Sequence, residues 1–475
     1  MRVPIYKLCE EKNVEKLHET ALHILETKGS VIKHPKMLEI LSAHGAKVDA
    51  KTQCVRFPRA VVEKALKSLP AKFTLHDRNG KPSLRMGEGN GYLASGHGAL
   101  NTIDFESGKR RPASRDDMEK FAFLSDALTN IDFVAMVVMP GDVAPKASAL
   151  HAAYAAFKNT TKHFYFSPDI AESLPAIFDL ARIVSGEKDL ARKPVISMQL
   201  SPTSPLTWSP EALEILLASA KAGVPFTVLS DVMPGASGPI TLAGTIALNH
   251  AEVVTGLVLA QMARPGTPVI YSTAASEFDM RVGNMATAAP EVILTAVATV
   301  QLAKRIRVPI HTCAPETESH ADDQQQAWEK TMTTFLPMLS GGDILVNGGM
   351  FSSGMTAGFE QLIIDDELYG YLRRFIRGFE INTDTLAVDT IQNVEHGGSF
   401  LAVDHTLKHL RSGEHWDPGI SNRAVYDVWN ALPAKTLAAK AHAKAAELFK
   451  THQPQRLPDD KLREMEKVIA DFERC

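Results

Sequence analysis

The chain has 475 residues, of which 45% are hydrophobic and 22% are charged, a composition typical of globular domains with a buried core. Its 51 Lys and Arg side chains against 55 Asp and Glu give a net charge of −4, which argues against a nucleic-acid partner and against an anionic membrane surface. The four scattered cysteines, Cys9, Cys54, Cys313 and Cys475, form no CxxC pair and indicate a reducing compartment.

The expected location is the cytoplasm. The N-terminal residues lead into charged side chains and lack the apolar centre of a signal peptide. The most apolar long stretch, Thr241 to Ala263, contains the polar residues Asn249, His250, Glu252 and Gln261. Since a membrane-spanning helix would have to bury all four in lipid, this stretch is expected not to span a membrane.

Residues 1–115 predict an α+β extension. Leu17, Ala21 and Leu25 share one helical face, and Gly29 follows where that helix should stop. A glycine-rich, strand-like stretch covers residues 87–98. Because no buried strand precedes these glycines, turns between antiparallel strands explain them better than a phosphate-binding loop does.

Residues 116–400 predict a (β/α)8 barrel of the TIM type. Short apolar runs alternate with helical periodicity, at a spacing of one βαβ step. The runs cover residues 133–138, 163–166, 195–198, 226–229, 269–271, 309–311 and 344–346. An eighth strand is expected near Val388 to Val394. An open doubly wound sheet is the alternative, but no GxGxxG or GxxxxGK[ST] follows any run.

Residues 401–475 predict a C-terminal helical extension. Leu437, Ala441, Ala445 and Leu448 share one helical face, and Leu462, Met465, Ile469 and Phe472 share another. These helices are expected to pack on the barrel or on a second subunit, so a homodimer is a candidate assembly.

Catalytic groups of a barrel lie at the C-terminal ends of its strands. His311 and Cys313, followed by Glu316, Glu318 and His320, are the sharpest candidates for a metal site. A zinc site with thiolate ligands usually has a further cysteine, which is absent nearby, so a polar strand end with a free thiol is favoured and no metal is expected. The sequence contains no HExxH and no GxSxG, so nothing supports a hydrolase.

Two glycine clusters follow predicted strands. Residues 341–351 surround a strand end, where glycines allow a ligand to approach the backbone or simply form a tight loop. Residues 395–401 lead to His405, His409 and His415. A histidine-dense helix is more typical of a solvated surface than of a metal site, and the glycine pair is expected beside the barrel mouth.

Three motifs together resemble the trimethylamine methyltransferase family, in its large branch whose members lack pyrrolysine. They are Ser95-Gly96-His97-Gly98 with Asp116-Asp117, the run from Asn347 to Thr356 leading to Asp365-Asp366-Glu367, and Gly397 to Leu401 with His405-Thr406. The resemblance covers nearly the whole chain. It implies a (β/α)8 barrel and transfer of a methyl group from a methylamine to a separate corrinoid protein.

The resemblance also bears on the substrate. Founding members of the family carry pyrrolysine at or next to the position that matches Met350, so no pyrrolysine is expected here. Trimethylamine is a poor methyl donor until it becomes cationic, whereas a quaternary amine is already cationic and leaves as a neutral tertiary amine. The expected substrate is therefore a quaternary amine, with glycine betaine first and proline betaine or carnitine as relatives. The protein then contributes positioning and electrostatics.

The candidate substrate-binding residues are aromatic groups for the trimethylammonium head and donors for a carboxylate. They are Tyr271, Phe351, Phe166, His311 and Asn347. No DxHxxG signature is present, so cobalamin is expected on a cognate corrinoid protein that docks over the barrel mouth. The residues expected to face this cofactor are His97, Gly348, Gly349, Met350, Gly397 and Gly398.

Two other functions stay open. One is a zinc-dependent methylcorrinoid:thiol methyltransferase that uses His311 and Cys313. The other is a betaine-binding protein that has kept the barrel without catalysis.

Overall fold

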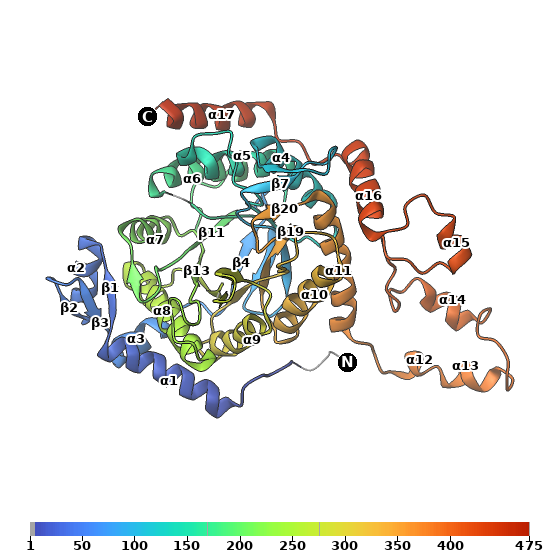
Figure 1. Cartoon of the computed structure of the whole chain (residues 1–475), viewed down its shortest axis with the longest axis horizontal. Coiled ribbons are helices and arrows are strands. Elements are labelled where there is room, and N and C mark those ends of the chain that lie inside the picture. The colour runs from blue at the N-terminus through green and yellow to red at the C-terminus, as the bar shows by residue number, and fades with distance from the viewer. Residues whose placement is uncertain (1–4, 169, 275, 475) are drawn as a thin grey trace.

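A closed parallel β-barrel forms the centre of the protein (Figure 1). The computed structural model describes residues 5–168, 170–274 and 276–474. The barrel strands follow one another around the barrel in chain order. They are β6 (Tyr92–Ser95), β9 (Val134–Ala135), β10 (Phe164–Phe166), β11 (Ile196–Leu200), β13 (Phe226–Ser230), β14 (Val269–Thr273), β17 (Ile310–Cys313) and β18 (Ile344–Gly348).

All seven apolar runs are barrel strands, which confirms the predicted (β/α)8 architecture. The predicted eighth strand near Val388 to Val394 is wrong, because α13 (Val388–Asn393) is a helix outside the barrel. Its place is taken by β6, from the glycine-rich stretch before residue 116. β6 pairs with β18 in parallel, and Ala94 bridges to Phe133 beside β9, so β6 brings the two ends of the sheet together.

One helix follows each barrel strand and forms the outer ring, with short elements in several of the connecting loops. The helices are α4 (Arg115–Ala127), α5 (Ser148–Asn159), α6 (Leu174–Ser185), α7 (Pro210–Ala222), α8 (Leu242–Ala263), α9 (Pro290–Arg305), α10 (Gln324–Leu339) and α11 (Phe359–Arg377). Pro210 and Pro290 open α7 and α9 as predicted, because the first turn needs no donor from them. The Ser209 hydroxyl accepts the Ala212 N–H and caps α7.

The short elements between strands and helices bring loops over the strand ends. They are η1 (Pro145–Ala147), η2 (Ala171–Ser173), β12 (Thr207–Trp208), the hairpin β15 (Glu277–Asp279) with β16 (Asn284–Ala286), and a four-stranded sheet in the order β19-β20-β7-β8. That sheet consists of β7 (Asn101–Ile103), β8 (Arg110–Pro112), β19 (Met350–Phe351) and β20 (Thr356–Ala357).

The N-terminal part packs on the outside and on the base of the barrel. It contains α1 (Glu11–Thr27), β1 (Ser30–Ile32), α2 (Pro35–Ala43), β2 (Lys47–Asp49), β3 (Cys54–Arg56) and α3 (Arg59–Lys67). The hairpin of β4 (Phe73–His76) and β5 (Pro82–Met86) follows. Its side chains Leu75, Leu84 and Met86 share a buried cluster with barrel residues such as Phe133 and Ile344, so the hairpin fills the interior.

The apolar helix α8 is a core helix of this ring. By length and hydropathy it could cross a membrane, but most of it is buried inside the protein, where it packs against α1, α7 and α9. Its polar side chains have partners there. His250 Nε2 lies 2.8 Å from His18 Nδ1, and Glu252 accepts hydrogen bonds from Ser204, Ser230 and the Leu206 N–H.

The C-terminal helices divide into two groups. α16 (Leu437–Thr451) packs against α11 and α4, and α17 (Asp459–Arg474) packs against α6 and α5. The segment between α11 and α16 carries α12 (Thr383–Leu386), α13, α14 (Asp404–Leu410) and α15 (Tyr426–Asn430). In Figure 1 this segment extends away from the barrel, and we call residues 379–436 the arm.

Candidate active site

A cavity of about 220 Å³ opens at the C-terminal ends of the barrel strands, the end at which barrel enzymes place their catalytic groups. Its walls come from strands β11 to β18 and the loops that follow them, from the loop after β6 and from α9. The lining residues include His97, Gln199, Leu229, Asp231, Thr273, Ser276, Met285, Thr287, Val292, His311, Cys313, Glu316, Val346 and Asn347. The cavity is smaller than pockets that hold drug-sized ligands.

Two carboxyl groups line this cavity. Asp231 follows β13, and burial raises its pKa to about 6, while a hydrogen bond from Ser276 Oγ (3.3 Å) opposes the shift. Glu316 lies three residues beyond β17, and burial raises its pKa to about 7. No lysine or arginine is among the described lining residues, so the cavity is acidic when both groups are ionised.

Two hydrogen bonds and one nearby positive charge act on Glu316. The Asn347 side-chain amide donates to Oε1, and Thr287 Oγ1 donates to Oε2 at 3.3 Å. The charge of Lys330 also acts on Glu316 and lowers its pKa against the effect of burial. These partners stabilise the ionised carboxylate in a site that would otherwise keep it protonated.

Two histidines of the cavity are neutral at neutral pH. Burial lowers the pKa of His311 to about 3 and that of His97 to about 4. His311 Nδ1 lies 2.6 Å from Ser272 Oγ, and His97 Nε2 lies 3.0 Å from Ser167 Oγ. The other nitrogen of each ring, His311 Nε2 and His97 Nδ1, is buried and has no hydrogen-bond partner among the described residues.

Cys313 lines the same cavity as a protonated thiol. Burial, followed by the charges of Glu316 and Asp231, raises its pKa well above the usual range. Because zinc binds the thiolate, this environment disfavours Cys313 as a metal ligand. Within the described ranges, His311 and Cys313 belong to no group of three metal-ligating atoms close enough to share an ion.

The three aromatic residues predicted from sequence lie outside this cavity. The Tyr271 hydroxyl lies 3.0 Å from His250 Nδ1 of α8, so the side chain points to the outer ring. Phe166 stacks on Phe164, its neighbour on the same face of β10, in the core between the barrel and the outer helices. Phe351 lines a separate surface pocket with Ile103 and His320. The geometry therefore brings together His97, His311 and Asn347 but not Tyr271, Phe166 and Phe351.

Close packing explains why glycine occupies the positions near Met350. A Cβ at Gly348 would lie 2.7 Å from the Ala94 carbonyl oxygen, and one at Gly349 would lie 3.0 Å from Leu362 Cβ. A Cβ at Gly96 would lie 2.2 Å from Met350 Cγ, and the His97 N–H lies 2.8 Å from Met350 Sδ. Met350 is thus buried beside the cavity residue His97, while a contact with a corrinoid stays a prediction.

Gly397 and Gly398 were expected beside the barrel mouth, and this placement is wrong. Both are exposed residues of the arm, between α13 and α14. The expectation depended on an eighth strand at Val388 to Val394, and that segment is a helix.

Several cavity residues have no motif in the sequence. Met285 and Thr287 reach the cavity from or beside β16, and Ser353 and Gly354 reach it from the turn between β19 and β20. Tyr165 lies beneath the histidines: its ring centroid is 5.5 Å from that of His97 and 5.8 Å from that of His311. Its hydroxyl donates to Gln199 Oε1 at 2.9 Å. The position of Tyr165 in a predicted strand is the only signal that could have identified it.

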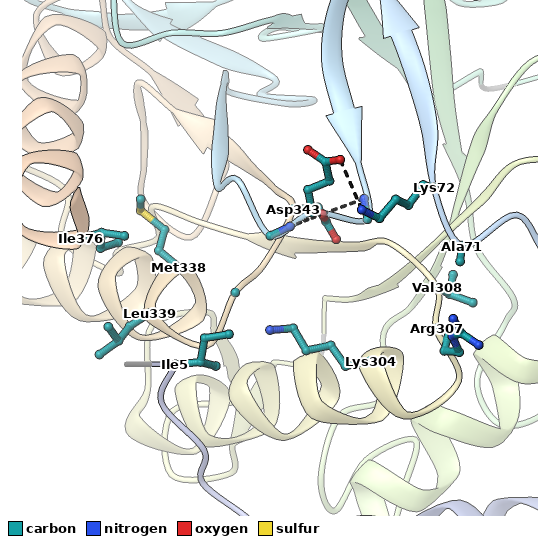
Figure 2. A pocket seen from close by; sticks show the side chains of 14 residues that line it. Ile5, Ala71, Lys72, Lys304, Arg307, Val308, Met338, Leu339, Asp343 and Ile376 are labelled. Atoms are coloured by element: carbon teal, nitrogen blue, oxygen red, sulfur yellow. Dashed lines mark hydrogen bonds and ion pairs between the residues drawn. The ribbon is translucent and has the colours of Figure 1, made fainter. Parts of the chain in front are cut away.

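A larger cavity, of about 540 Å³, lies at the opposite end of the barrel (Figure 2). Several of its polar groups bind one another. Asp343 Oδ1 accepts the N–H groups of Gly87 and Gly89 at 2.8 Å each, and Lys72 Nζ lies 3.3 Å from Glu88 Oε1. Polar networks at the N-terminal face of a barrel support stability rather than catalysis, so we assign the active site to the smaller cavity.

Comparison with known proteins shows which family the chain belongs to. The family model described as trimethylamine methyltransferase (MTTB) matches residues 1–474. The trimethylamine methyltransferase MttB of Methanosarcina barkeri (strain Fusaro / DSM 804) is 32% identical over 467 residues, covering 97% of this chain and 94% of the relative. The glycine betaine methyltransferase of Desulfitobacterium hafniense (strain Y51) is 33% identical over 471 residues, covering 98% and 97%.

A solved structure supports the fold. The monomethylamine methyltransferase MtmB of Methanosarcina barkeri superposes with a TM-score of 0.51 at 12% identity, covering 98% of this chain and 96% of the other. Matches of the family model and of these relatives extend over almost the entire sequence. The chain therefore belongs to the trimethylamine methyltransferase (MTTB) family of corrinoid-dependent methyltransferases that act on methylated amines.

Proposed function

We propose that this protein transfers a methyl group from a quaternary amine, with glycine betaine as the expected substrate, to the Co(I) centre of a separate corrinoid protein. The observation that carries the proposal is the charge of the cavity. Asp231 and Glu316 supply two carboxyl groups, and no cationic side chain is among its described lining residues. Such a site attracts a permanently charged ammonium head and disfavours a purely anionic ligand.

The cavity also offers surfaces for the methyl groups. Leu229, Val292 and Val346 line it together with the two acids, so the head can contact apolar side chains while its charge is balanced. At a separation of 4 Å and an effective dielectric constant near 20, each ionised carboxylate contributes roughly 4 kcal/mol of attraction before desolvation. In this proposal, carboxylate charge binds the trimethylammonium head, a role predicted from the sequence for aromatic side chains.

The carboxylate of a substrate such as glycine betaine needs uncharged hydrogen-bond donors in this cavity. The Asn347 amide is engaged with Glu316, whereas His311 Nε2 and His97 Nδ1 have no partner among the described residues. We propose that one or both rings donate an N–H to the carboxylate of the substrate. This arrangement keeps that carboxylate away from Asp231 and Glu316 and orients the molecule.

Met350 fits a substrate that needs no covalent activation. The residue at this position is an ordinary methionine, buried beside His97. A quaternary amine releases a neutral tertiary amine and requires only alignment with a strong nucleophile. Reduced cobalt supplies that nucleophile on the partner, and the cavity binds the donor, orients it and excludes water.

We propose that the corrinoid protein docks on the rim of the cavity. Exposed apolar side chains occur on loops next to the lining residues: Ile240, Met280, Val282 and Met355. Ile240 and Met280 are neighbours, since both would touch a Cβ built on Gly235. Met280 and Val282 belong to the turn of the β15–β16 hairpin, which also supplies Met285 to the cavity. Clustered exposed apolar groups of this kind indicate an interaction site.

A substrate screen tests the proposal. Purified protein is mixed with reduced cobalamin as methyl acceptor and with glycine betaine, proline betaine, carnitine, choline or trimethylamine. Formation of methylcobalamin is followed by absorbance. We expect a betaine to react and trimethylamine to be inert. Consumption of trimethylamine with every betaine left intact would overturn the proposal. Calorimetric binding of a betaine without any spectral change would instead indicate a non-catalytic binding protein.

A further inference from the structure

The arm has almost no core of its own. Of its described residues, 379–436, only Ile420 is buried, and no side chain of α12, α13, α14 or α15 is. These helices are four to seven residues long, shorter than helices that are stable without packing. Chain segments that lack an apolar core are commonly held by disulfides, metals or association.

The contacts between α12 and α14 converge on one carboxylate. Asp384 of α12 faces two histidines of α14, His405 and His409, which are four residues apart and therefore share a helical face. His409 Nε2 lies 3.1 Å from Asp384 Oδ2, and His405 Nε2 lies 3.0 Å from the Asp384 carbonyl oxygen. The imidazole centroids are 4.3 Å apart.

We propose that Asp384, His405 and His409 bind a zinc ion that fastens α12 to α14. One ligand atom of each residue lies within 4.8 Å of the others. Around a tetrahedral zinc ion with bonds of about 2.0–2.1 Å, ligand atoms are roughly 3.4 Å apart, so small side-chain rotations complete the site. Two imidazoles and one carboxylate are ligands that zinc prefers, and water can take the fourth position.

The neighbouring lysine leaves one carboxylate oxygen to the ion. Lys408 Nζ lies 2.6 Å from Asp384 Oδ1, whereas the contact with His409 is made by Oδ2. Asp384 can therefore keep its ion pair and bind zinc through one oxygen. His409 Nε2 lies close to the carboxylate but makes no hydrogen bond among the described residues. A metal-free ion pair is the alternative that the experiment has to exclude.

This site differs from the His311–Cys313 pair in both place and role. It lies on the arm, outside the cavity-lining residues, and its ligands come from two helices. The described hydrogen bonds and ion pairs between these helices all involve Asp384. Binding energy of a metal that joins two such elements becomes folding energy of the segment. The sequence-based expectation of a metal-free chain does not anticipate this site.

Zinc titration of the full-length protein tests the inference. Untagged protein is treated with a chelator, dialysed and titrated with Zn²⁺ by calorimetry, and Co²⁺ absorbance serves as a second probe. We expect one ion per chain. The His405→Ala/His409→Ala variant should bind more than about 100-fold more weakly, since loss of even an outer-shell partner costs 10- to 100-fold. The matched control His396→Ala/His415→Ala, which removes two exposed histidines of the same arm, should bind normally.

Limited proteolysis gives a readout that is independent of the titration. Zn²⁺ should slow trypsin cleavage within the arm of the parent and of the control, but not in the His405→Ala/His409→Ala variant. Asp384→Asn, a milder change, should weaken binding in the same direction. Absence of binding by the parent at micromolar Zn²⁺ would overturn the inference, and so would equal binding by both double variants.

Discussion

Lys330 and Asp365 form an ion pair inside the protein, with Nζ 2.8 Å from Oδ2 and both side chains at most 2% exposed. The same Asp365 oxygen accepts the Gly349 N–H at 2.6 Å, and Gln361 Nε2 donates to the other oxygen at 2.8 Å. The pair thus ties α10 and α11 to the end of β18. Because the charge of Lys330 also acts on Glu316, it connects the packing of the outer ring with the acidity of the cavity.

Lys330→Met should strongly destabilise the protein. Removing one partner of a buried ion pair leaves the other charge without compensation and typically costs about 3–5 kcal/mol. Urea unfolding followed by circular dichroism measures the change. Lys444→Met, which breaks an exposed pair with Glu447, should cost less than about 1 kcal/mol. Equal losses in both variants would contradict a special role for the buried pair.

Glu316 should make substrate binding depend on pH. Its pKa is raised to about 7, so it is neutral below this pH and anionic above it. A cationic substrate binds the anionic form better, and kcat/KM for a quaternary amine should rise from pH 6 to pH 8. Glu316→Gln should have a lower kcat/KM and a weaker rise. A profile that is identical in parent and variant would remove Glu316 from substrate binding.

Ionisation of Glu316, which should favour substrate binding, should lower the stability of the folded protein. Its folded-state pKa lies above the unfolded value near 4.3, so folding favours the protonated form. The stabilisation is present below pH 4 and is lost as the pH rises towards about 7. Glu316→Gln should therefore unfold at a higher temperature than the parent at pH 8, and the difference should shrink at pH 5. A variant that is less stable at pH 8 would contradict this expectation.

Asp231→Asn should raise the KM for a quaternary amine. The change keeps the size of the side chain and removes the negative charge, and a loss of about 1–2 kcal/mol corresponds to roughly a 5- to 30-fold increase. Steady-state kinetics with free cobalamin as acceptor measures it. Asp116→Asn on the exposed face of α4 is the matched control and should leave the KM unchanged.

Negative charges introduced on the rim of the cavity should slow methyl transfer to the corrinoid protein but not to free cobalamin. Met280→Glu/Val282→Glu places carboxylates on the turn of the β15–β16 hairpin, where we expect the corrinoid protein to dock. Methyl transfer to that protein should slow several-fold, whereas transfer to free cobalamin should persist. Leu401→Glu, at an exposed apolar position of the arm, serves as the control. Unchanged kinetics with the partner protein would move the docking surface elsewhere.

Tyr271 should matter for stability rather than for binding. Its hydroxyl contacts His250 on α8, so Tyr271→Phe should cost about 0.5–1.5 kcal/mol of stability. The KM for the substrate should not change, because the side chain does not line the cavity. A several-fold rise in KM would contradict this and indicate that Tyr271 contacts the substrate.

The fold was largely predictable because its signal is local. Seven barrel strands are short apolar runs between helical stretches, and Pro210 and Pro290 mark helix starts. β6 was missed since glycines flank it and since it has only four residues. Its pairing partners, β18 and the residues before β9, are distant or irregular in sequence, so nothing near it indicates a barrel strand.

The candidate site was predictable only in part. The rule that barrel chemistry lies at strand ends found His311 and Asn347, and both line the cavity. It could not distinguish residues that point inward from those that point outward. Tyr271 precedes Ser272 in the same strand, yet its side chain faces α8, because successive side chains of a strand point to opposite faces.

By itself, the sequence determined the barrel, the helices around it and the methionine at position 350, because periodicity and residue identity are properties of neighbouring residues. Tertiary structure alone decided that Glu316 and Asp231 share one cavity, that β6 closes the barrel, and that Asp384 meets His405 and His409. These relationships join residues far apart in the chain. They also depend on burial, which sets the charge of Glu316 near neutral pH and arises only when the whole chain has packed.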